Sequence, residues 1–79
     1  MTTKSKFRLK GKSRDSYLGL VLDFPLASIK SDGHFAEAQR VIDQLLARGT
    51  LDEGEETYLD ALSDLVGAYE DEHHPIEPA

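Results

Sequence analysis

The chain has 79 residues, no cysteine, no tryptophan and a formal net charge of −6. A chain of this length forms one small domain, whose single core seldom supplies more than roughly 3–5 kcal/mol of net stability. The absence of cysteine excludes a disulfide-framed miniprotein and any zinc site with thiolate ligands. Stability must therefore come from helix packing, from self-association or from a partner.

The charges are divided along the sequence. Residues 1–14 contain six lysine and arginine residues and no acid, whereas residues 15–79 contain three cations and all fifteen acidic residues. The second segment therefore repels nucleic acid and favours a basic protein partner. The longest apolar run, residues 17–26, is interrupted by polar residues and is much shorter than the ~20 residues of a membrane span. No signal-peptide cleavage pattern follows it, so we expect a cytoplasmic protein that does not contact a membrane.

Residues 1–14 carry a cation at every second position from Lys4 to Arg14. A segment with so little apolar content is predicted to be a disordered basic arm. The functional alternative is an arm that contacts a phosphate backbone or an acidic neighbour.

The next segment allows two interpretations. Asp15 would cap a short helix with apolar residues at helical spacing, namely Tyr17, Leu20, Val21 and Phe24. Residues 17–22 could also form a buried strand, because periodicity does not separate the two for so short a run. We favour the helix, which Pro25 must end because a residue before proline is pushed toward extended geometry. Residues 24–29 then form an apolar connector over the core.

Residues 31–49 have the pattern of an amphipathic helix. Ser31 or Asp32 is the expected cap, and Gly49 is expected to end the helix in the left-handed conformation. The apolar side of this helix consists of Phe35, Ala38, Val41, Ile42, Leu45 and Leu46.

Residues 52–73 are predicted to form a second, longer helix. Asp52 and Glu55 have the spacing of a capping box, and Pro75 prevents continuation. The core-facing stripe consists of Tyr58, Leu59, Leu62, Leu65, Val66 and Tyr69. Because so few residues separate the two long helices, they must fold back on each other. The predicted fold class is all-α: an antiparallel αα-hairpin preceded by a short helix and a disordered basic arm, with residues 15–79 forming one small helical domain.

Motifs for catalysis and metal binding are sparse. The sequence has no glycine-rich phosphate loop, and its serines belong to no recognisable nucleophile motif, so we expect neither an enzyme nor a cofactor. Glu70 and His73 have the i, i+3 spacing found in some carboxylate metal sites. The opposing stripe is apolar, so we interpret residues 70–74 as a solvated helix end and expect no metal site.

Acidic residues gather along one side of the second helix, opposite its apolar stripe. These residues, called here the acidic face, are Glu53, Glu56, Asp60, Asp64 and Asp71. A solvated helix surface is the simple explanation, and electrostatic steering toward a basic protein partner is the functional one. The residues expected to form the core or a dimer face are Phe35, Ile42, Leu45, Tyr58, Leu62, Leu65 and Tyr69. A hairpin with one short extra element covers these stripes poorly, so we expect a homodimer or a permanent partner.

Three stretches resemble the N-terminal region of the longer HigA-type antitoxins, which are transcription regulators of type II toxin–antitoxin systems. They are residues 17–32 with the run YLGLVLDFPL, residues 38–46, and residues 59–76 with the most specific run, YEDEHHPI. The resemblance implies a helical region that pairs protomers and contacts the toxin, a small basic ribonuclease that cuts messenger RNA on the ribosome.

In that family a helix-turn-helix domain follows and binds operator DNA. The 79 residues contain no such motif, so the resemblance implies DNA contact only through a domain missing from this chain. The alternative function, of a different class, is a free-standing dimeric helical adaptor whose basic arm contacts nucleic acid or an acidic partner.

Overall fold

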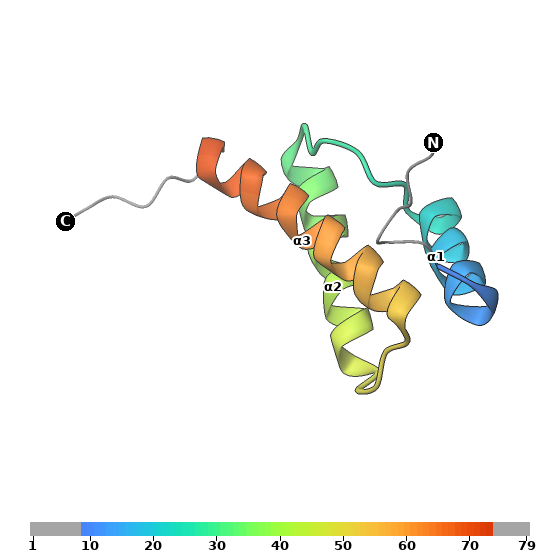
Figure 1. Cartoon of the computed structure of the whole chain (residues 1–79). Coiled ribbons are helices and arrows are strands. Elements are labelled where there is room, and N and C mark those ends of the chain that lie inside the picture. The colour runs from blue at the N-terminus through green and yellow to red at the C-terminus, as the bar shows by residue number, and fades with distance from the viewer. Residues whose placement is uncertain (1–8, 74–79) are drawn as a thin grey trace, which may run out of the picture.

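The computed structural model describes residues 9–73, and the expectations for residues 1–8 and 74–79 lie outside this range. The described part is all-helical, as predicted, with α1 (Gly11–Asp23), α2 (Asp32–Ala47) and α3 (Glu53–His73) (Figure 1). None of these three helices combines the length and the apolar character needed to cross a membrane.

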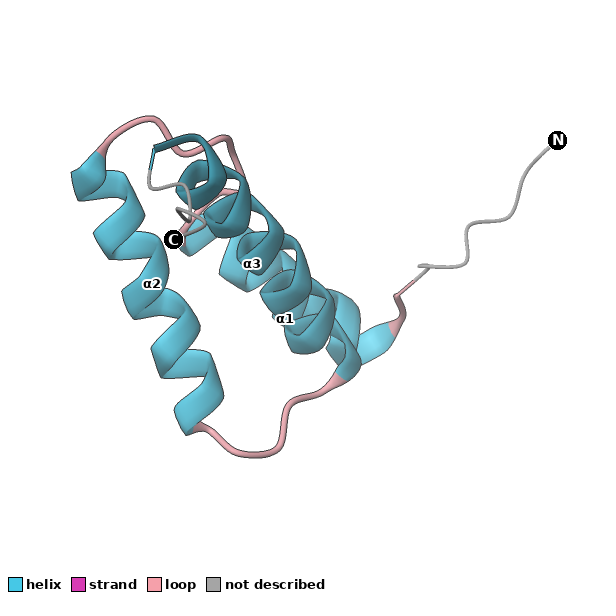
Figure 2. Cartoon of the chain, turned by 90° about the vertical axis from the view of Figure 1, so that its left-hand side faces the viewer, coloured by secondary structure: helices cyan, strands magenta, loops and turns pink. Residues whose placement is uncertain are grey.

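The longest helix, α3, is the one on which the other two helices pack. Both α1 and α2 pack against it, whereas no Cα atom of α1 comes within 8 Å of a Cα atom of α2 (Figure 2). The connector that joins α1 to α2, residues 24–31, places Ile29 in the core with 8% of its surface exposed. The described chain is therefore a hairpin with a third helix attached to one side of α3.

Contacts at both ends show that α2 and α3 run antiparallel. Arg48, just after α2, forms an ion pair of 2.5 Å with Glu55 in the first turn of α3. At the other end the Tyr69 hydroxyl donates a hydrogen bond of 2.5 Å to Asp32, the first residue of α2. This arrangement is consistent with the predicted hairpin.

The predicted caps at both ends of α2 and at the start of α3 are confirmed. The Ser31 hydroxyl accepts a hydrogen bond of 3.1 Å from the backbone N–H of His34, and Gly49 has φ +86°. Asp52 and Glu55 form a reciprocal capping box, with N–H to carboxylate distances of 2.8 and 2.9 Å. Local sequence therefore determines where the hairpin helices begin and where the first one ends.

The first helix differs from its prediction. It begins at Gly11 rather than at Asp15, so the last four residues of the predicted basic arm are helical. Lys10 occupies the cap position, and its side chain makes no capping hydrogen bond. The strand alternative for residues 17–22 is wrong, and the helix ends at Asp23, as Pro25 requires.

The core lies where α2 and the connector meet α3. The buried apolar residues are Ile29, Ala38, Leu45, Tyr58, Leu62, Val66 and Tyr69. Of the seven residues predicted for the core or a dimer face, Leu45, Tyr58, Leu62 and Tyr69 are buried. The other three, Phe35, Ile42 and Leu65, are half-buried and pack against this core. No residue of α1 is fully buried.

Candidate functional site

The position of α1 depends on a close approach to α3 at Gly54. A Cβ atom on this glycine would lie 2.8 Å from the carbonyl carbon of Ser13 and still closer to its oxygen. Beside this contact the Ser16 hydroxyl donates a hydrogen bond of 2.7 Å to the Asp52 carboxylate. The start of α3 thus binds the backbone and a side chain of α1 directly, which explains why α1 is helical from Gly11 without a side-chain cap.

The Asp52 carboxylate joins α1 to the start of α3. It accepts hydrogen bonds from the Ser16 hydroxyl and from the backbone N–H of Glu55. These bonds, the Ser16 bond first, lower the pKa of Asp52 below its ordinary value of 3.8, because they favour the ionised form. An ionised carboxylate also suits the positive N-terminal end of α3.

Tyr58 lies at the meeting point of all three helices. Its side chain is completely buried, and its hydroxyl donates a hydrogen bond of 2.5 Å to the carbonyl of Phe24. The rings of Tyr58 and Tyr17 meet edge to face, with centroids 6.4 Å apart. Burial raises the pKa of the Tyr58 phenol, and the negative charge of Asp23 adds to the rise. Tyr58 therefore remains a neutral donor that holds the end of α1.

Aromatic contacts close the far end of the hairpin. The ring centroids of Phe35 and Tyr69 are 5.1 Å apart, and His73 stacks on Tyr69 at 4.2 Å. The hydrogen bond to Asp32 raises the pKa of the Tyr69 phenol. Within residues 9–73 no group of three or more His, Asp or Glu side chains is arranged to hold a metal ion. His73 here packs on an aromatic ring.

All five residues of the acidic face are exposed on α3, on the side opposite Tyr58 and Leu62. The ion pairs among residues 9–73 join Arg40 to Glu37 and Arg48 to Glu55, and the His73 ring nitrogen lies 3.6 Å from a carboxylate oxygen of Glu72. None of the five acidic-face residues takes part in an ion pair within this part of the chain. The acidic face therefore carries five negative charges, and none of them forms an ion pair with a cation of the described residues.

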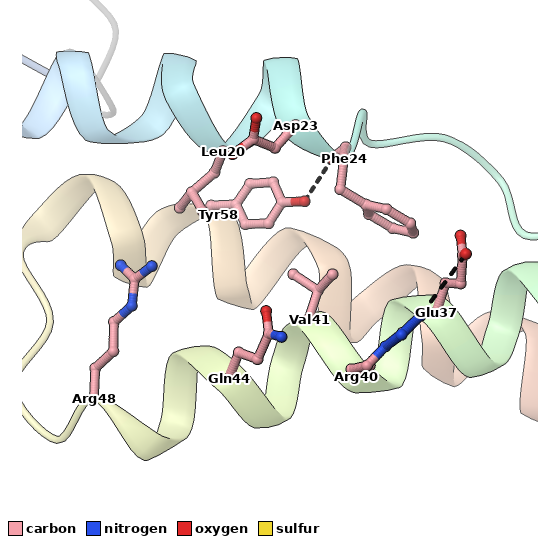
Figure 3. A pocket seen from close by; sticks show the side chains of 9 residues that line it. All are labelled: Leu20, Asp23, Phe24, Glu37, Arg40, Val41, Gln44, Arg48 and Tyr58. Atoms are coloured by element: carbon pink, nitrogen blue, oxygen red, sulfur yellow. Dashed lines mark hydrogen bonds and ion pairs between the residues drawn. The ribbon is translucent and has the colours of Figure 1, made fainter.

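A groove lies between α1 and α2, which run along the top and the bottom of Figure 3 with α3 between them. Its volume is about 310 Å³ and it is open to solvent. The residues that line it are Leu20, Asp23, Phe24, Glu37, Arg40, Val41, Gln44, Arg48 and Tyr58. The polar residues along the α2 side of the groove recur every three or four residues, so this edge carries two guanidinium groups, each of them paired with a glutamate.

Sequence reasoning missed this groove. Arg40 and Arg48 are two of the three cations in residues 15–79, and their spacing of eight residues puts them on one side of α2. The spacing of these two arginines could have indicated that one side of the first long helix differs from the acidic remainder of residues 15–79. The groove itself depends on the separation of α1 from α2, which no local pattern reports.

No protein-family model, curated protein or solved structure matches the chain. The resemblance to HigA-type antitoxins is therefore an expectation from its residues, and a function must be argued from the surfaces described above.

Proposed function

We propose that this chain is the N-terminal region of a HigA-like antitoxin and transcription regulator. In this proposal it binds a basic, messenger-RNA-cleaving toxin, pairs with a second copy of itself, and contacts DNA only through a domain outside the chain. The observation that carries the proposal is the exposed acidic face of α3, without ion pairs among residues 9–73. The residue patterns of stretches 17–32 and 59–76 supply the family.

The acidic face suits a basic partner for electrostatic reasons. From Glu53 to Asp64 the α-helical rise of 1.5 Å per residue gives a stripe of about 16 Å. The like charges of Glu56, Asp60 and Asp64, each four residues apart, cost the helix a few tenths of a kcal/mol per pair. A protein that cleaves RNA must present cations to phosphates. A field of opposite sign on its partner raises the association rate by about 10- to 1,000-fold at low salt.

The same contact would inhibit the RNA-cleaving activity of the toxin. Carboxylates that pair with the cations of an RNA-binding surface occupy the positions that RNA phosphates would take. The acidic face would thus guide the toxin to the antitoxin and cover its substrate surface.

The test is the rate of association with the product of any small basic reading frame found beside this gene, measured by stopped flow over a range of salt concentrations. Reversing Asp60 and Asp64 to Lys should slow association at least about tenfold at low salt, with little change in melting temperature because both side chains are exposed.

The matched control reverses Asp43 and Glu70, which are also exposed acids but lie off the acidic face. It changes the net charge equally and should slow association much less. Equal slowing by both pairs would show that net charge matters and the acidic face does not. No slowing by Asp60→Lys with Asp64→Lys would refute the steering role.

A second candidate, the adaptor with a basic arm, is favoured by the exposed cations at the start of α1. Lys10, Lys12 and Arg14 are exposed and form no ion pair within residues 9–73. Replacing the three with Gln should weaken binding to duplex DNA and reduce its dependence on salt if this function is correct. Deletion of residues 1–14 would be a poor test, because it removes the first turn of α1.

A further inference from the structure

The acidic face of α3 is open to a cationic occupant. Its five carboxylates are exposed, and none forms an ion pair within residues 9–73. In the proposed function the occupant is a basic partner protein. The chain also has a basic segment of its own, since residues 1–14 contain six cations and no acid. The place where this segment leaves the described fold decides whether it can reach the same surface.

The basic arm leaves the fold at the end of α3 where the acidic face begins. The backbone of Ser13 lies against Gly54, where an added Cβ would be 3.2 Å from the Ser13 Cα atom. Glu53, the first acid of the acidic face, is the neighbour of Gly54. Lys10 is only three residues before Ser13. The residues before Lys10 therefore start close to Glu53.

The charges before Lys10 have a spacing that matches the acidic face. Alternate residues of an extended segment lie on one side, about 6–7 Å apart. Acids four residues apart on a helix are about 6 Å apart along its axis. The cations at alternate positions are Lys4, Lys6 and Arg8, and the acids four residues apart are Glu56, Asp60 and Asp64. The two rows of charge are thus opposite in sign and similar in spacing.

The length of the arm is sufficient for this contact. From Lys10 back to Lys4 the chain spans about 20 Å when it is extended. The distance along α3 from Glu53 to Asp64 is about 16 Å, and the long lysine side chains add further reach. An arm that follows α3 from its first turn would bring Arg8 toward Glu53 and Lys4 toward Asp64.

We propose that the part of the basic arm before Lys10 binds the acidic face of its own chain, through Lys4, Lys6 and Arg8. The contact is autoinhibitory, because a basic partner must displace the arm before it binds α3. Exposed ion pairs are weak and are screened by salt, so a partner with more cations can replace them. This inference rests on the role of the acidic face in the proposed function and adds its regulation.

Paramagnetic relaxation in the whole chain tests the contact directly. The chain has no cysteine, so Ser5→Cys gives a single site for a nitroxide label within the arm. At low salt the label should broaden the amide signals of Asp60 and Asp64 more than that of Asp43, an exposed acid outside the acidic face. At about 1 M salt, where the screening length is about 3 Å, the difference should disappear.

The same measurement identifies which copy supplies the arm. Spin-labelled protein without an isotope label is mixed with unlabelled ¹⁵N protein, so that only contacts between two copies broaden the signals. Broadening that is confined to the doubly labelled chain supports the inference. Equal broadening in the mixture would assign the arm to a second copy and overturn it. Equal broadening of Asp43 and Asp60 at low salt would show that the arm does not prefer the acidic face, which also overturns it.

Competition for the acidic face is measured with a fluorescent decalysine peptide as the probe, by anisotropy at low salt. The arm variant replaces Lys4, Lys6 and Arg8 with Gln. The control variant replaces Lys12, Arg14 and Lys30, which are exposed, so that both variants change the net charge equally. The arm variant should bind decalysine about 3- to 10-fold more tightly than the control, because three exposed ion pairs no longer compete.

Equal affinity of the two variants for decalysine would overturn the inference, because the gain would then come from net charge alone. None of these results depends on the toxin. The steering role of the acidic face is tested separately by the association rate of the chain with Asp60→Lys and Asp64→Lys, so an arm that does not bind α3 leaves that role intact. Failure of the steering test would leave the arm contact measurable by the nitroxide label.

Discussion

Gly54 is the position where a single added methyl group should have the largest effect on this fold. In Gly54→Ala the new Cβ would lie 2.8 Å from the Ser13 carbonyl carbon and closer still to the oxygen. These are backbone atoms of a helix, so no side chain can rotate away. The whole of α1 must move from α3 or lose its first turn.

The change in the free energy of unfolding of Gly54→Ala is the sum of two opposed effects. Replacing glycine by alanine inside a helix gains up to about 1 kcal/mol from backbone propensity. Overpacking against a rigid neighbour costs about 1–3 kcal/mol and sometimes more, and movement of α1 also weakens the Ser16–Asp52 hydrogen bond. The net loss should be about 1–2 kcal/mol, a large part of the roughly 3–5 kcal/mol that such a core supplies.

Gly67→Ala is the matched control. Gly67 lies in the same helix, and a Cβ there would meet no atom within 4 Å. This variant gains the propensity without the clash, so it should be up to about 1 kcal/mol more stable than the wild type.

Thermal unfolding followed by circular dichroism at one fixed protein concentration measures both variants. For a domain of this size, 1 kcal/mol corresponds to about 4–8 °C in melting temperature. Gly54→Ala should melt below the wild type, and Gly67→Ala should melt above it. If Gly54→Ala melts at or above the wild type, the close approach of α1 to α3 does not exist in solution and the placement of α1 is wrong.

Three further predictions concern single hydrogen bonds. Asp52→Asn should be less sensitive to acid: the lowered pKa of Asp52 gives the wild type extra stability above pH 3.8, which disappears as the pH falls through the folded-state pKa. Tyr58→Phe should lose about 1 kcal/mol in urea unfolding, because the Phe24 carbonyl loses its donor. Ser31→Ala should lose about 1 kcal/mol by the same measurement, because the cap of α2 is removed.

Each of these predictions has its own contradicting result. A stability difference between Asp52→Asn and wild type that does not change below pH 4 would mean that Asp52 has its ordinary pKa. Wild-type unfolding of Tyr58→Phe would mean that its hydroxyl contributes nothing to holding the end of α1. Ser28→Ala is the control for Ser31→Ala, because Ser28 lies outside the helices and is exposed. Equal effects of these two would show that capping is not the cause.

The local sequence was sufficient for the hairpin. The caps at Ser31 and Asp52 and the turn at Gly49 depend on residues no more than three positions apart, so they can be recognised without knowledge of the fold. The acidic face was equally predictable, since the periodicity of one helix determines which residues share a side.

The tertiary structure decided what lies around α1. Its start at Gly11 depends on Ser13 meeting Gly54, two residues that are 41 positions apart in the sequence, and the apparent cap at Asp15 pointed to a later start. The groove exists because α1 and α2 both pack on α3 and not on each other, which is a fact about the distance between helices. Local hydrogen bonds and helical periodicity involve residues a few positions apart, so they can be recognised in the sequence. The separation of two helices is determined by all the side chains packed between them, which come from distant parts of the sequence.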